Sequence, residues 1–160
     1  MRINLGAGLT HFPGSDWVSC DRHGDVDVNC DAYPLPFPTD HADEIWAIHL
    51  IEHLHRSTVN LTLYEWFRVL KPGGKLVLEM PCLDKIAQHI VNGEENMRLT
   101  LLGLYGDPRD PKPDMMHQWC WGKKEIVEAL TGVNFCDVQI MEPIFHWPAR
   151  DFRVEARKPS

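Results

Sequence analysis

Apolar residues follow two periodicities along the chain, and together these predict alternating strands and helices. Short apolar runs bounded by turn residues indicate strands, which we expect at residues 2–5, 17–20, 26–30, 44–48, 75–80, 137–141 and 151–156. Apolar spacings of three and four residues indicate helices, which we expect at residues 57–70, 83–92, 96–105 and 123–130. Prolines in 33–38 and 107–114 exclude regular structure there, because proline fixes φ and removes a donor.

The clearest of these helices lies between residues 57 and 70. Its apolar residues fall on one helical face, at Leu63, Trp66, Phe67 and Leu70. Ser57 is the expected N-cap, and the Lys-Pro-Gly-Gly sequence at 71–74 is a typical helix stop. The next strand should therefore begin at Lys75.

Strands that alternate with helices predict an open α/β sheet. The short connection 142–150 suits an antiparallel pairing of the last two strands. Ligands of such sheets bind beyond the carboxyl ends of the strands. Ligand-binding residues are therefore expected where each predicted strand ends.

Length and charge narrow the possible functions. The 160 residues fit a single domain over 1–160, and the formal net charge of −7 makes nucleic acid an unexpected partner. No run approaches the roughly 18 apolar residues of a membrane helix, and the N-terminus has no secretion signal, so we expect a cytoplasmic protein without membrane contact. The five scattered cysteines suit small buried side chains in a reducing compartment.

Three strand ends carry residues that suit an adenosine ligand. Gly6-Ala7-Gly8 follows the first strand and allows a ligand close to the backbone. Asp21 ends the second strand and could accept from both ribose hydroxyls, and Asp31 ends the third and could accept from an adenine amine. Taken singly, the glycines could form a simple turn and each aspartate could be a solvated turn residue.

The glycine segment does not suit a dinucleotide. Position 11 is histidine where the G-x-G-x-x-G motif has its third glycine, and Pro13 and Gly14 oppose a full helix. A dinucleotide places its pyrophosphate at a helix N-terminus. The segment therefore favours an adenosine ligand without phosphates.

Several segments, in this order along the chain, carry a family resemblance: 3–8, 18–21, 31–37, 51–54 and 65–74. Together they resemble the class I S-adenosylmethionine-dependent methyltransferases, most closely the small type 11 methyltransferase-domain group. A weaker similarity follows at 117–130 and in the closing hairpin. The resemblance implies a Rossmann-like, doubly wound, mostly parallel seven-stranded sheet whose last strand is antiparallel.

The resemblance also implies the cofactor, S-adenosyl-L-methionine, and the residues around it. Gly6 and Gly8 would border its methionine part, Asp21 its ribose, and Asp31 its adenine. The full set of expected cofactor-binding residues is Asn4, Gly6, Ala7, Gly8, Asp21, Arg22, Asp31, Ala32 and His49. Asn4 stands where the family often has an acidic residue, and we expect no N-terminal helices of the kind that usually cover the cofactor. The segment 93–118, as a substrate-binding lid, or a second copy of the chain would then close the open cofactor side.

The stretch HLIEHLH at 49–55 allows a different interpretation. His49-x-x-Glu52-His53 matches the signature of one class of zinc peptidases. That interpretation needs both histidines on one helical face and a distant third ligand, and the stretch directly follows a predicted strand. We therefore expect no metal, and we expect these residues to support the turn or to separate cofactor from acceptor.

The sequence thus predicts an S-adenosylmethionine-dependent methyltransferase that acts on a small-molecule acceptor of unknown identity. If the acceptor must lose a proton, a histidine is the natural base, with His49 as the first candidate and His117 as the second. Two alternatives stay open: a catalytically silent module that binds S-adenosylmethionine or S-adenosylhomocysteine, and a metal hydrolase that uses His49, Glu52 and His53.

Overall fold

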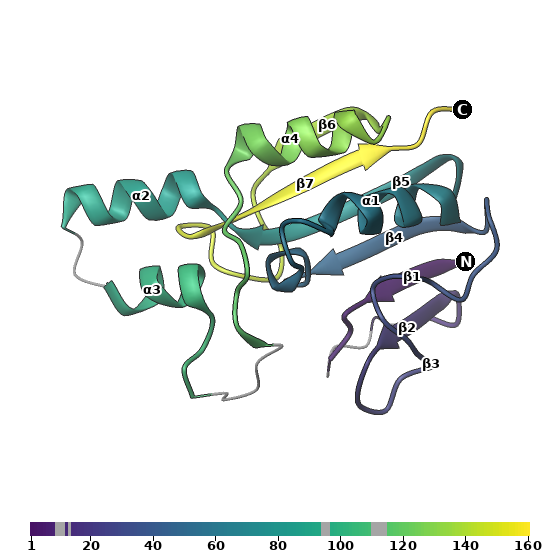
Figure 1. Cartoon of the computed structure of the whole chain (residues 1–160), viewed down its shortest axis with the longest axis horizontal. Coiled ribbons are helices and arrows are strands. Elements are labelled where there is room, and N and C mark those ends of the chain that lie inside the picture. Colours follow the sequence, from purple (N-terminus) through teal and green to yellow (C-terminus); the bar gives the residue numbers. More distant parts are fainter. Residues whose placement is uncertain (9–11, 13, 94–96, 110–114) are drawn as a thin grey trace.

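The computed structural model describes the chain except for residues 9–11, 13, 94–96 and 110–114 (Figure 1). Its strands are β1 (Arg2–Leu5), β2 (Trp17–Asp21), β3 (Val28–Asn29), β4 (Ala42–Ile48), β5 (Leu70–Pro81), β6 (Cys136–Met141) and β7 (Asp151–Arg157). Its helices are the short 3-10 helix η1 (Ile51–His53) and the α-helices α1 (Val59–Val69), α2 (Leu83–Asn92), α3 (Met97–Tyr105) and α4 (Lys123–Gly132). The described helices include none long and apolar enough to cross a membrane.

The seven strands form one sheet in the order β3-β2-β1-β4-β5-β7-β6. The pairs from β3 to β5 are parallel, whereas β7 runs antiparallel to both of its neighbours, β5 and β6. This topology confirms the predicted α/β, Rossmann-like, mostly parallel sheet with an antiparallel last strand. The switch point lies between β1 and β4, where the chain order reverses and where ligands of such sheets bind.

One face of the sheet carries the hydrophobic core. Alternate residues of the strands point to it, including Ile3, Ile45 and Leu76, and all three are fully buried. Helices α1 and α4 cover this face and contribute Trp66 and Leu130. Figure 1 shows both helices lying along the sheet.

The opposite face has little helical cover. Right-handed crossovers from β1 through β2 to β3 would place their helices on this face, but residues 22–27 form no helix, and neither do the described residues of 6–16. Side chains of the strands cover it instead: Trp17 and Trp46 meet edge to face at 5.6 Å, and the Arg153 guanidinium lies 4.8 Å from the Trp46 ring. The sequence predicted that no full helix follows the glycine segment. The connection between β2 and β3 also lacks a helix.

Several predicted boundaries were wrong, and three of them matter for the fold. The third strand is only Val28–Asn29 rather than 26–30. Helix α1 starts at Val59 after the N-cap Thr58, because the Ser57 hydroxyl lies 2.7 Å from His55 Nδ1 instead of capping the helix. The chain is already extended at Leu70, so β5 begins there and passes through 71–74 with an irregularity in its pairing with β4.

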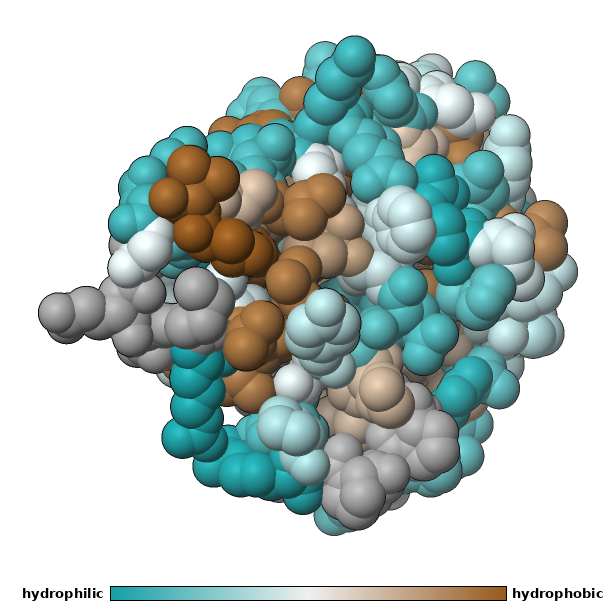
Figure 2. All heavy atoms as spheres, turned by 60° about the vertical axis from the view of Figure 1, so that its left-hand side comes forward, coloured by the Kyte–Doolittle hydropathy of each residue, from teal (hydrophilic) through white to brown (hydrophobic). Residues whose placement is uncertain are grey.

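Helices α2 and α3 project beyond the carboxyl end of β5, next to each other (Figure 1). Figure 2 shows apolar side chains gathered on this side of the molecule. Its exposed apolar residues include Leu83, Ile90, Val91, Leu101 and Tyr105. Part of the predicted 93–118 lid, at 94–96 and 110–114, lies outside the described residues.

Candidate functional site

The glycine segment after β1 lies at the carboxyl edge of the sheet, as predicted. Gly6 and Gly8 have φ of +65° and +53°, the left-handed region that favours glycine. A Cβ on Gly6 would lie 2.9 Å from Leu50 Cδ1, so Gly6 lets the β4 end pack closely against β1. A Cβ on Gly8 would meet no described atom within 4 Å, so open space adjoins this part of the loop.

Asp21 ends β2 beside the glycine segment. Its Oδ2 accepts a hydrogen bond from Gly8 N at 2.8 Å, and its Oδ1 accepts one from His23 N at 3.0 Å. The parallel pairing of β1 with β2 brings these residues together, since Leu5 is opposite Cys20. The second-strand carboxylate therefore lies on the rim where a nucleoside would be expected.

The other predicted cofactor residues lie along the same edge. Arg22 and Asp31 form an exposed ion pair, which links the ends of β2 and β3. Asn4 is buried in β1, and Ala32 is half-buried with its carbonyl accepting a hydrogen bond from Trp66 Nε1 at 3.0 Å. Asp31 is thus engaged by Arg22, a contact the sequence did not predict.

His49 follows β4 and lies between two buried carboxylates. Its backbone has φ of +51°, which is uncommon for a residue with a side chain, and its amide donates to Glu79 O at 2.8 Å. Its Nδ1 forms an ion pair with Glu52 Oε1 at 2.8 Å, and its Nε2 lies 3.6 Å from Asp151 Oδ2. The ring centroid of His146 is 3.9 Å away.

These neighbours determine the charge of His49. Burial alone would lower its pKa, but the Glu52 and Asp151 carboxylates outweigh burial and raise the pKa of His49 to about 9. In the same way, burial would raise the pKa of Glu52, whereas His49 lowers it. At neutral pH the pair is therefore an imidazolium and a carboxylate.

Glu79 and Asp151 hold the β6–β7 loop against this rim. Glu79, at the carboxyl end of β5, accepts hydrogen bonds from the amides of Ile144, Phe145 and His146 at 2.8–3.0 Å. Asp151 accepts two hydrogen bonds from Arg150, at 2.6 and 2.8 Å. We did not identify Glu79 or Asp151 from the sequence. A charged residue inside an apolar strand was a usable signal for Glu79, whereas Asp151 begins a strand with other charged residues and offered no such signal.

His117 also reaches the rim, on the other side of Glu52. The amides of Gln118 and Trp119 donate to Glu52 O at 2.7 and 3.1 Å, which docks this segment onto η1. The His117 Nδ1 donates to Gly103 O at 2.9 Å, so the remaining ring nitrogen, Nε2, carries the lone pair. Burial lowers the pKa of His117, which keeps the ring neutral.

The stretch 49–55 therefore does not place His49 and His53 side by side as the zinc ligands of a peptidase. Both nitrogens of His49 face carboxylates, whereas His53 lies next to His117, with ring centroids 4.8 Å apart. One ligand atom from each of Glu52, His53 and His117 lies within 4.8 Å of the others. The two catalytic candidates, His49 and His117, are thus both neighbours of Glu52.

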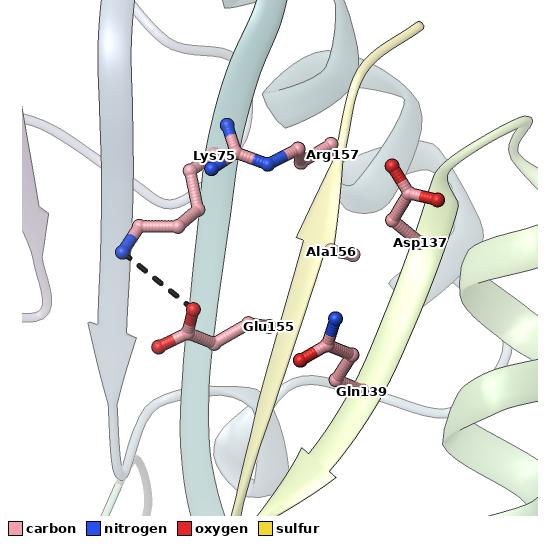
Figure 3. Close-up of a pocket in the computed structure, with 6 residues that line it drawn as sticks. All are labelled: Lys75, Asp137, Gln139, Glu155, Ala156 and Arg157. Carbon is pink, nitrogen blue, oxygen red and sulfur yellow. Dashed lines mark ion pairs between the residues drawn. The ribbon is translucent and has the colours of Figure 1, made fainter.

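A separate polar pocket of about 230 Å³ lies away from this rim (Figure 3). It is lined by Lys75, Asp137, Gln139, Glu155, Ala156 and Arg157. The Lys75 Nζ is 3.6 Å from Glu155 Oε2. Lys75 lies opposite Arg157 in the pairing of β5 with β7, near the amino end of β5. The pocket is therefore at the opposite end of the sheet from the glycine segment.

Residues 16–78 match the family model described as a methyltransferase domain. No protein with a curated description matches the sequence significantly.

Solved structures share the fold at low sequence identity. A SAM-dependent methyltransferase from Archaeoglobus fulgidus aligns with 98% of this chain and 85% of its own, at 16% identity and a TM-score of 0.66. Burkholderia thailandensis 1,6-didemethyltoxoflavin-N1-methyltransferase, with 1,6-didemethyltoxoflavin and S-adenosylhomocysteine bound, aligns with 99% and 71% at 14% identity and a TM-score of 0.68. A chain from the complex of the Haloferax volcanii Trm112 methyltransferase activator with a putative methyltransferase aligns with 99% and 82% at 16% identity and a TM-score of 0.65. These structures show that the chain has the fold that the resemblance implied.

Proposed function

We propose that this chain binds S-adenosylmethionine and transfers its methyl group to a small-molecule acceptor. The match of residues 16–78 to the methyltransferase-domain model and the shared fold support this. The observation that supports this most directly is the position of Asp21. Its carboxylate lies at the carboxyl end of β2 and holds the glycine segment through Gly8 N at 2.8 Å. This is the arrangement expected of a ribose-binding carboxylate.

The residues at this rim fit the cofactor. Each Asp21 oxygen accepts one backbone hydrogen bond, and a carboxylate has about four lone-pair sites, so Asp21 can still accept from both ribose hydroxyls. Gly8 adjoins open space, which suits the methionine part of the ligand. Arg22, Asp31 and Ala32 line the same edge and would face the adenine.

Bound S-adenosylmethionine supplies a methyl group on a positively charged sulfur, ready for in-line displacement. The chain's task is then alignment, which is worth up to about 7–11 kcal/mol. His49 is best suited to donating a hydrogen bond or orienting a group, because it is already protonated at neutral pH. His117 is neutral with its lone pair on Nε2, so it is the better candidate for accepting a proton from the acceptor.

The segment around His117 is where we expect the acceptor to be selected. Tyr105, Met115, Met116 and Trp119 are exposed there on both sides of the residues at 110–114. Aromatic and methionine side chains suit an apolar or aromatic small molecule. The net charge of −7 disfavours a nucleic acid.

Calorimetric titration with S-adenosylmethionine tests the proposal. We expect Asp21→Ala to weaken binding by roughly 10-fold to 100-fold, since hydrogen bonds to charged groups contribute about 1.5–3 kcal/mol. Asp25→Ala is the matched control, because Asp25 is an exposed carboxylate four residues away. No binding by the wild-type chain would refute the proposal, and binding without transfer of a labelled methyl group to a metabolite extract would favour the silent module.

A further inference from the structure

We propose that Glu52, His53 and His117 form a binding site for one divalent transition-metal ion of the zinc class. The inference goes beyond methyl transfer and does not depend on it. It also revises our expectation from the sequence, which foresaw no metal and grouped His49, rather than His117, with Glu52 and His53.

The first argument is a buried carboxylate with one unpartnered oxygen. Glu52 is fully buried and its Oε1 is paired with His49 Nδ1 at 2.8 Å, whereas its Oε2 has no hydrogen bond to a described residue. Leaving a buried polar group without partners costs free energy. His53 Nδ1 is also buried without a hydrogen-bond partner in the described structure. A cation at this position would satisfy both groups.

The second argument is the orientation of His117. Its Nδ1–H donates to the carbonyl of Gly103 at 2.9 Å, which fixes the tautomer with the lone pair on Nε2. A backbone carbonyl that holds one ring nitrogen is the usual support of a metal-binding histidine. His49 supports Glu52 in a similar way from the other side, at Oε1, and leaves Oε2 for an ion.

The third argument is that the backbone holds the three ligands together. Glu52 and His53 are consecutive in η1, and two amides after His117 donate to the carbonyl of Glu52. The ligand atoms lie within 4.8 Å of one another. A tetrahedral zinc ion with bonds of about 2.0–2.2 Å needs ligand atoms about 3.3–3.6 Å apart, so binding requires an inward shift of at most about 1.5 Å.

The ligand types select the metal. Two imidazoles and one carboxylate suit zinc, iron, cobalt or nickel, whereas magnesium and calcium prefer oxygen ligands. Three protein ligands leave an open position for water or another molecule, as in catalytic zinc sites. A metal ion and a proton would compete for the same lone pair on His117, so the ion would exclude this residue from acting as a base.

The test uses the full chain after removal of metals with a chelator, without S-adenosylmethionine. We expect one equivalent of zinc by calorimetry and elemental analysis, and a rise in Tm of roughly 5–10 °C at a zinc concentration 100 times the Kd. Magnesium should leave Tm unchanged. Cobalt should bind with the visible absorption of a low-coordinate site.

Variants separate this site from adventitious binding. His53→Gln and His117→Gln should each weaken zinc binding at least tenfold, whereas His55→Gln, an exposed neighbour outside the cluster, should bind as the wild type does. Circular dichroism identifies a variant that fails to fold. In that case the other single variant and the cobalt spectrum of the wild type test whether the cluster binds the metal. The proposal is wrong if the wild type binds no zinc, or if the double variant His53→Gln/His117→Gln binds as much as the wild type.

Discussion

Replacing Asp151 with asparagine would remove a buried negative charge while preserving the shape of the side chain. Asp151 is fully buried, accepts two hydrogen bonds from Arg150, and lies 3.6 Å from His49 Nε2. Burial alone would raise its pKa, but His49 and Arg150 lower the pKa of Asp151 from 3.8 to about 2. This decrease corresponds to roughly 2–3 kcal/mol of folding free energy.

The pH dependence follows from the direction of this shift. A carboxyl group with a lower pKa in the folded state stabilises the fold above its unfolded pKa, and this contribution disappears as the pH falls through the folded value. For Asp151 the ionisation contributes most of this free energy at pH 5.5 and about half of it at pH 3. His49 is protonated in the folded state throughout this range and mostly protonated in the unfolded state, so it adds little to the change.

We therefore expect Asp151→Asn to lower the free energy of unfolding by about 2–4 kcal/mol at pH 5.5, because Arg150 also loses its charged partner. The difference from wild type should shrink by about 1 kcal/mol at pH 3. Urea unfolding at both pH values measures this, with Asp25→Asn, which removes an exposed carboxylate, as the control. A difference that stays constant between the two pH values would refute the electrostatic reasoning, and no difference at pH 5.5 would refute the role of the carboxylate.

Two further substitutions test the packing of the rim. Gly6→Ala should destabilise the fold by about 1–3 kcal/mol, through the φ of +65° and a Cβ 2.9 Å from Leu50 Cδ1, whereas Gly132→Ala, with no atom within 4 Å, should be nearly neutral in thermal unfolding. Glu79→Gln removes the charge that three loop amides share, so hydrogen exchange at the amides of 144–146 should become faster while that of β1 stays the same; unchanged exchange at 144–146 would show that the charge does not hold the loop.

The sequence predicted the parts of the site that depend on strand ends. Asp21 was placed beside the glycine segment because carboxyl ends of parallel strands meet at one edge, and the structure has that arrangement. Local spacing also placed Leu63 and Trp66 correctly on the buried face of α1. Strand ends and helix faces can be predicted because they depend on the spacing of residues that are close in the sequence.

The contacts of His49 could not be predicted in the same way. Its partner Asp151 is about 100 residues away, and it reaches His49 only because β7 inserts next to β5. The error at Ser57 has a local cause: the hydroxyl that could cap α1 lies 2.7 Å from the ring of His55, which competes with the backbone. The sequence therefore identified His49 and His117 as candidate bases, but only the three-dimensional contacts show that His49 is the charged one.

The strand order has a consequence for the chain as it leaves the ribosome. β7 lies between β5 and β6 in the sheet, yet it is translated after both of them. At about 5–20 residues per second, Asp151 emerges roughly 5–20 seconds after His49. Once β5 has emerged and until β7 follows, β5 presents an open edge, which is prone to pairing with other chains, and His49 lacks its contact with Asp151.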